Sequence, residues 1–146
     1  MSIVRCSSNC IELYEATRKS KQYRYIIYRI VSDAFIDVEY VGAREQNYED
    51  FLAQLMRGGA DECRYGLYDL EYTQFCEITQ KQRQRERLVL LCWCPAEAKP
   101  KWKIQYLSYL RPFMDHLKGI QHYKTAREPY EITRQAVERY FGAVVK

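Results

Sequence analysis

The sequence lacks the residue patterns that mark most catalytic and metal sites. It contains no glycine-rich phosphate loop, no nucleophile elbow and no Cys-x-x-Cys pair. Only two histidines occur, His116 and His122, and both lie far in the sequence from any pair of cysteines. We therefore expect a protein that is not an enzyme, with no metal site and no cofactor. Both histidines are interpreted as surface or partly packed residues.

Long apolar runs are also missing. The longest, Leu88–Cys94, is far shorter than the roughly 20 residues that a membrane-spanning helix needs. The first residues, MSIVRCSS, contain no basic segment followed by an apolar stretch, as a secretory signal would. We therefore expect a cytoplasmic protein with access to the nucleus, in which the six cysteines are reduced thiols.

Length and charge limit the number of domains and the kinds of partner that can be expected. The 146 residues fall within the usual size of one domain and are enough for a hydrophobic core. The net charge of +4 is of mixed sign, so it favours acidic partners only weakly and does not by itself indicate nucleic acid. The 14 tyrosines suit half-buried positions and protein interfaces.

Hydrophobic periodicity predicts an α/β (α+β) fold, with a central mixed sheet of about five strands covered by helices on both faces. Thr79–Arg87 is polar and basic, and we interpret it as a solvated loop between two strands. The expected elements are a flexible arm (1–8), a helix (Cys10–Lys19), a hairpin (Tyr23–Val31 and Phe35–Val41), a helix that Asn47 caps and Gly58–Gly59 ends, strands at Cys63–Tyr72, Leu88–Cys94 and Ile120–Thr125, and a last helix from Pro129.

The segment Pro95–Gly119 is helix-periodic, with its apolar and polar residues on separate arcs. At about 100° per residue, Lys101, Ile104, Gln105 and Ser108 lie opposite the apolar arc. Pro112 is expected to kink the helix near Ser108–Arg111 and to begin a second short helix. The residues predicted to face the core are Tyr106, Leu107, Leu110, Phe113, Met114 and Leu117.

Two stretches resemble a known family. ADECRYGLYDLEY (60–72) is similar to the DCRYALYD-type strand of the actin-depolymerising factor/cofilin family, and LCWCPAEAKPKWKIQY (91–106) is similar to its FWxPxxAxxKxKMxY segment. Their separation and the YEDFLAQL helix also fit. The resemblance implies one ADF-homology domain over residues 1–146. It also implies a monomeric cytoskeletal protein that binds actin monomers and filament sides and promotes filament severing and depolymerisation.

The resemblance also implies how actin is bound. In the family, a kinked long helix inserts into the cleft between two subdomains of actin, which is acidic. Lys101 and Lys103 match the two lysines of that helix, and Ile104 matches its methionine, with Ser108 on the same side. On this resemblance the cations orient actin while Ile104 supplies apolar contact area.

The N-terminus corresponds to a regulatory position of the family. Ser2 matches best the serine whose phosphorylation switches actin binding off, and Ile3 takes the place of a usual small residue. A phosphate adds close to two negative charges, which would repel an acidic partner. Ser2 and Ile3 are therefore expected at the actin contact, with Ser2 as the candidate phosphorylation site.

A second surface in the family binds filaments only. Arg85 and Arg87 match its paired basic positions before the central strand. At the C-terminal end, an ungapped alignment puts Arg139 at an acidic position and Tyr140 at a basic one. A shift of one residue places Glu138 and Arg139 at that pair.

Two alternatives remain open. A diverged relative would keep monomer binding through the lysine face but sever filaments weakly. A module of another class would bind phosphoinositides or nucleic acid through the basic residues 81–87. Phosphoinositides are also partners in the family, but its lysine-rich stretch is replaced here by Phe113–His116, so inhibition by acidic lipid should be weaker. Nucleic acid is not an expected partner if the protein is an actin-binding protein of this family.

Overall fold

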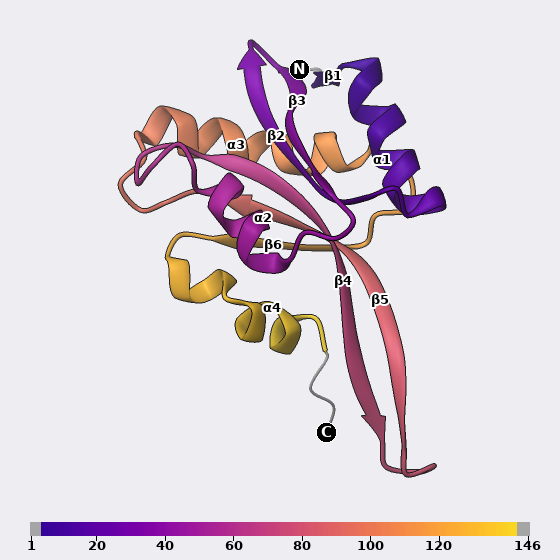
Figure 1. Ribbon diagram of the computed structural model, residues 1–146. Coiled ribbons are helices and arrows are strands. Elements are labelled where there is room, and N and C mark those ends of the chain that lie inside the picture. Colours follow the sequence, from indigo (N-terminus) through magenta and orange to yellow (C-terminus); the bar gives the residue numbers. More distant parts are fainter. Residues whose placement is uncertain (1–3, 143–146) are drawn as a thin grey trace.

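The computed structural model describes residues 4–142, which form a six-stranded mixed sheet with helices on both faces (Figure 1). The strand order is β1-β3-β2-β4-β5-β6. The elements are β1 (Arg5–Cys6), α1 (Ser8–Ser20), β2 (Tyr23–Ser32), β3 (Phe35–Ala43), α2 (Tyr48–Leu55), β4 (Arg64–Cys76), β5 (Lys81–Trp93), α3 (Pro100–Met114), β6 (His122–Ala126), a 3-10 turn η1 (Pro129–Ile132) and α4 (Arg134–Tyr140). The predicted fold class is confirmed, with one short strand more than expected.

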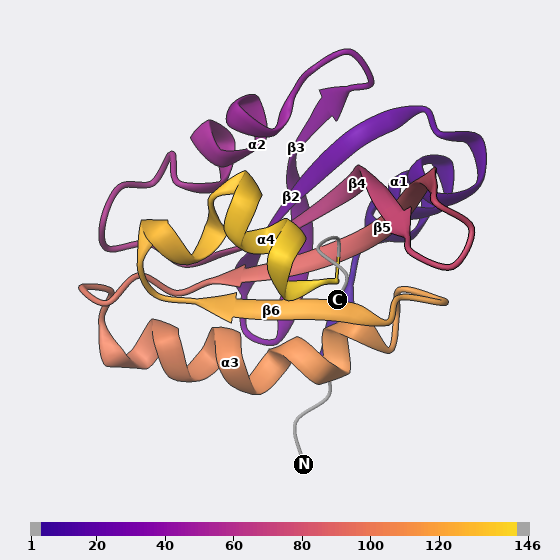
Figure 2. The ribbon, with the colours of Figure 1, turned by 90° about the horizontal axis from the view of Figure 1, so that it is seen from below.

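The central strands are buried on both faces because helices cover both. Figure 2 shows α3 on one side of the sheet and α2 and α4 on the other. Leu67 packs in the cluster beneath α1 and α3, whereas its neighbour Tyr68 packs in the cluster beneath α2 and α4. This alternation follows from the two-residue period of a strand. The sheet is therefore the layer against which α3 packs.

The chain joins the fold earlier than predicted. Residues 1–8 were expected to form an arm, but Val4 is buried and β1 pairs in parallel with β3. Ser7, not Ser8 or Asn9, caps α1 by accepting a hydrogen bond from the backbone N–H of Cys10. The Ser7 hydroxyl also donates to Asp37 at 2.6 Å. A two-residue strand is too short to produce a periodic signal, so its sequence resembles that of a loop.

Helix α2 forms as predicted, with Asn47 at its N-cap. The Asn47 and Asp50 side chains bond reciprocally to each other's backbone N–H groups, which is a capping box. Phe51 and Leu55 are fully buried and pack over Gly66 of β4. Gly66 is therefore a position where α2 packs closely against β4.

We expect Gly66→Ala to destabilise the fold by about 1–3 kcal/mol, the usual cost of overpacking a core. An added Cβ would lie 2.7 Å from Phe51 Cζ and 2.8 Å from Leu55 Cδ1. Urea unfolding measures the change, with the exposed Gln82→Ala as the control. Equal unfolding midpoints for the two variants would contradict this account.

The segment predicted as a basic loop is a strand. Leu70–Cys76 pairs with Lys81–Arg87 residue for residue, and only Glu77–Gln80 forms the turn. This hairpin projects beyond the body of the sheet (Figure 1). Its cations Lys81, Arg83, Arg85 and Arg87 occupy alternate positions and so share one face. The loop prediction was wrong because polar residues alternating with polar residues show no hydrophobic period.

The C-terminal region also departs from its predicted boundaries. Pro129 was expected to begin the last helix, but it begins η1. Helix α4 follows as a separate helix with its own N-cap residue, Thr133. The Thr133 side chain accepts a hydrogen bond from the backbone N–H of Ala136 at 3.1 Å. Val137 is then buried against the sheet. Two short helical pieces with their own caps replace the continuous helix expected from the apolar pattern.

Candidate functional site

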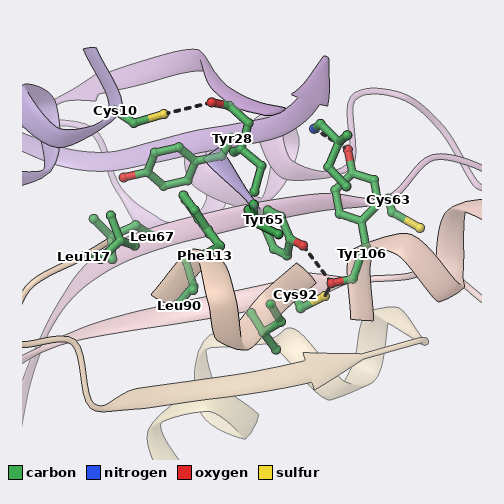
Figure 3. Close-up of a cluster of buried hydrophobic side chains, with 14 of the residues drawn as sticks. Cys10, Tyr28, Cys63, Tyr65, Leu67, Leu90, Cys92, Tyr106, Phe113 and Leu117 are labelled. Carbon is green, nitrogen blue, oxygen red and sulfur yellow. Dashed lines mark hydrogen bonds between the residues drawn. The ribbon is translucent and has the colours of Figure 1, made fainter. Parts of the chain in front are cut away.

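The inner side of α3 is anchored tightly to the sheet (Figure 3). The backbone carbonyl of Tyr106 accepts a hydrogen bond from the Tyr65 hydroxyl at 2.7 Å, and the Tyr106 hydroxyl accepts one from the backbone N–H of Ile30 at 2.9 Å. Burial raises the pKa of Tyr106 to about 12, so this hydroxyl stays neutral. Phe113 packs edge-on against Tyr28, with ring centroids 4.9 Å apart. These contacts fix the rotation of the helix and hence which residues face outward.

The outer side of α3 is apolar at its centre and basic at its edges. Ile104 is 64% exposed and Leu107 is 48% exposed. Lys101 and Ser108 are exposed on one flank of this pair. Lys103 lies on the other flank, half-exposed, and its ammonium donates to the carbonyl of Ala96 at 2.9 Å. The structure therefore brings together the four α3 residues predicted at the contact.

Leu107 was assigned to the core arc, and that assignment was wrong. It lies at the edge of the arc, about 100° from Tyr106, and the sheet below is already covered by Tyr106 and Leu110. Leu107 therefore turns outward beside Ile104. An exposed apolar pair on a helix whose inner side is packed is the kind of patch that marks an interaction surface. No sequence signal other than its marginal place in the arc identifies it.

The predicted division of α3 at Pro112 is also wrong. The helix is continuous from Pro100 to Met114, and the residues that follow, 115–119, form turns. Pro112 removes a backbone hydrogen bond, a change that costs about 3 kcal/mol in a helix interior. Here it lies in the last turn, between the buried residues Leu110 and Phe113. This packing holds the segment against the sheet despite the proline.

Ser2 and Ile3 lie outside the described residues, so their place at the contact stays a prediction. The first described residue, Val4, lies beside the C-terminal end of α3. Its carbonyl oxygen is 2.8 Å from Nε2 of His116. The chain therefore enters the described structure near the C-terminal end of this helix.

The residues predicted for filament binding lie on the hairpin and on α4. Arg85 and Arg87 share the basic face of β5, and Arg87 donates to the carbonyl of Phe141, just after α4, at 3.2 Å. Arg139 is exposed. Glu138 instead forms an ion pair with Arg134 of its own helix. The hairpin and the end of α4 thus adjoin, with Glu138 paired within the helix.

Two ionic residues of the DECRYGLYD stretch, Arg64 and Asp69, are buried and paired. Nε of Arg64 lies 2.7 Å from Glu39, and its Nη2 lies 2.7 Å from Glu62. Asp69 is fully buried, and its Oδ2 accepts from Arg44 at 2.7 Å and from Lys21 at 3.1 Å. The stretch that carries the family resemblance maintains the fold.

Within residues 4–142 the cysteines form neither a disulfide nor a metal site, and no helix is suited to cross a membrane. All six cysteines are free, and Cys63, Cys92 and Cys94 are buried together. A hydrogen bond to Cys94 and burial raise the pKa of Cys63, which keeps it a protonated thiol. Within residues 4–142 no group of three or more His, Cys, Asp or Glu side chains is placed to hold a metal ion. No helix in that range has the length and apolar character needed to cross a bilayer.

Comparison with known proteins identifies the family. Residues 3–141 match the family described as cofilin/tropomyosin-type actin-binding protein. The chain belongs to this family. Actin-depolymerizing factor 1 of Arabidopsis thaliana is 34% identical over 128 residues, which cover 87% of this chain and 84% of that protein. Actophorin of Acanthamoeba castellanii is 30% identical over 138 residues, 94% of each chain.

The fold agrees with this family assignment. The crystal structure of cofilin from Streptomyces griseoflavus superimposes with a TM-score of 0.77 at 30% identity, covering 93% of this chain and 97% of that one. The resemblance stated from residues 60–72 and 91–106 is therefore confirmed, and so is the cofilin-like fold. The outer side of α3, with its exposed apolar pair, is therefore the candidate functional surface.

Proposed function

We propose that this cofilin-type protein binds actin monomers and filament sides and promotes filament severing and depolymerisation in the cytoplasm. The observation that carries the proposal is the outer side of α3. Ile104 and Leu107 are exposed there between Lys101 and Lys103, on a helix that Tyr106 and Phe113 lock to the core. A rigid apolar patch with cations at its edge suits an acidic partner that has an apolar cleft.

Filament binding would use a second surface. Figure 2 shows α4 on the side of the sheet away from α3. The hairpin cations alternate along β5 in phase with Val89 and Leu91 and therefore face the same side as α4. A molecule with two contact surfaces on opposite sides can engage two neighbouring filament subunits at once. Its binding energy can then distort the contact between those subunits, which is the physical basis we propose for severing.

Two assays test this function. A monomer assay follows inhibition of nucleotide exchange on actin, and co-sedimentation follows binding to filaments. Exchange inhibition together with pelleting supports the proposal. Exchange inhibition without pelleting would instead support the diverged protein that binds monomers but severs weakly. The pairing of Glu138 with Arg134 makes this the alternative to test first.

The order of two charge reversals gives a sharper prediction. Lys103→Glu should weaken monomer binding about tenfold or more, because it places an anion beside the apolar pair facing an acidic partner. Arg85→Glu, on the far side of the sheet, should leave monomer binding nearly unchanged and weaken pelleting with filaments. The dissociation constant for labelled actin monomers measures the first effect. The reverse order would contradict the assignment of α3 as the monomer contact.

We also propose that Ser2 regulates this surface. Val4 lies against the C-terminal end of α3, so a phosphate two residues earlier adds negative charge close to the actin contact. Phosphorylated protein is expected to bind monomers at least tenfold more weakly than the unmodified form. Equal affinities of the two forms would contradict a regulatory role.

The row of four cations on the hairpin favours one further candidate, binding of phosphoinositide or nucleic acid. The variant Lys101→Ala with Lys103→Ala separates it from actin binding. Unchanged actin binding by this double variant, together with loss of lipid or RNA binding after neutralising Arg83 and Arg85, would favour the alternative. Vesicles containing phosphoinositide and a short RNA serve as the probes.

A further inference from the structure

Beside the outer side of α3 lies a groove that the actin contact described above does not use. It runs between the first turns of α3 and the end of β2, has a volume of about 250 Å³, and is lined by residues that include Ile30, Val31, Asp33, Lys101, Trp102 and Gln105. A second hollow of about 110 Å³ adjoins it and shares Ile30 and Trp102. The indole of Trp102 is therefore the wall between two hollows.

Trp102 is exposed although other aromatic residues of α3 are packed. It is 38% exposed, and Val31 across the groove is 48% exposed. The Lys101 ammonium lies over the indole, 5.2 Å from the ring centroid. This contact orients a cation of the α3 surface against the wall of the groove. The groove is thus continuous with the surface that carries Lys101 and Ile104.

The size of the groove indicates what it can hold. Its volume is below the range of about 300–1,000 Å³ that is typical of small-molecule sites. A single large apolar side chain fits this space better than a cofactor does. Tryptophan is also among the residue types most enriched at energetically dominant interface positions.

We propose that Trp102 and Val31 form a second subsite, which receives an apolar side chain of the actin monomer that α3 contacts. The inference rests on the proposed actin binding, and it adds a residue pair that sets how tightly the monomer is held. Lys101 then contributes to both parts, since its ammonium contacts the indole and lies beside Ile104 on the helix surface. An acceptor on actin next to the inserted side chain completes the contact with Lys101.

The test measures monomer affinity for four variants. Trp102→Ala and Val31→Asp should each weaken binding about tenfold, and Trp102→Phe should recover part of the loss. Tyr130→Ala is the matched control, because Tyr130 is an aromatic residue that is 73% exposed on η1, across the sheet. It should bind as the unchanged protein does. Thermal unfolding of each variant checks that the fold is intact.

The outcomes separate the two proposals. Normal binding by both Trp102→Ala and Val31→Asp, with binding lost in Ile104→Asp, would overturn the subsite and leave the proposed function in place. Normal binding by Ile104→Asp as well would overturn the proposed function and the subsite together. Equal losses in Trp102→Ala and Tyr130→Ala would also overturn the subsite, since the effect would then not depend on position.

Discussion

Replacing Ile104 by aspartate is expected to weaken actin monomer binding by about a hundredfold, with little effect on stability. Ile104 is 64% exposed, so the fold does not depend on its side chain. In the complex, the substitution removes apolar contact area and buries a carboxylate that has no partner, against an acidic surface. Losses of roughly 2–4 kcal/mol are usual for a central interface residue, and 2.7 kcal/mol is about a hundredfold in affinity. Titration of labelled monomers measures the change.

The control for this experiment is Ile78→Asp. Ile78 lies in the hairpin turn and is 93% exposed, so the same chemical change is made at another exposed isoleucine far from α3. It should bind monomers normally. Similar losses in both variants would mean that the effect comes from added negative charge in general, and the α3 surface would lose its assignment.

Much of the fold follows from local sequence patterns. The hairpin of β2 and β3 and the capped helix α2 were predicted because their signals are local, namely β-branched runs, a turn, and the capping residue Asn47. The sheet topology was expected from the family resemblance, because periodicity alone does not fix the order of the strands. The additional strand β1 and the long hairpin were missed, because two residues are too few for a period and a polar strand has no hydrophobic one.

The candidate site shows the same limit at the level of single residues. Periodicity separated the two sides of α3 but placed Leu107 on the wrong one. Whether a residue at the edge of an apolar arc faces the core or the solvent depends on how much of the sheet is still uncovered. That depends on Tyr106 and Leu110 and their partners on distant strands. The neighbourhood of Trp102 and Val31 could not be predicted at all, since it joins residues 71 positions apart in the sequence.

Arg64→Met is expected to destabilise the protein by about 2–3 kcal/mol, because it removes charge-assisted hydrogen bonds of a buried guanidinium whose carboxylate partners are partly exposed. The Arg64 side chain is 8% exposed and donates to Glu39, to Glu62 and to the carbonyl of Cys63. Its loss removes the nearest cation from both Glu39 and Glu62 at the edge of the core. Methionine preserves much of the apolar stem, so the lost charge and hydrogen bonds dominate the effect. Urea unfolding measures it.

The matched control is Arg29→Met. The Arg29 side chain is 46% exposed, and its only ionic contact within residues 4–142 is to Glu39 at 4.0 Å, so its loss should cost no more than about 1 kcal/mol. Neutralising the abandoned acids as well, with Glu39→Gln and Glu62→Gln in the Arg64→Met background, should restore part of the stability. Actin binding by the folded fraction should stay normal throughout, because Arg64 lies beneath the surface of α3. Equal destabilisation by Arg29→Met would show that general charge balance, and not this buried cluster, explains why the arginine of the DECRYG stretch is needed.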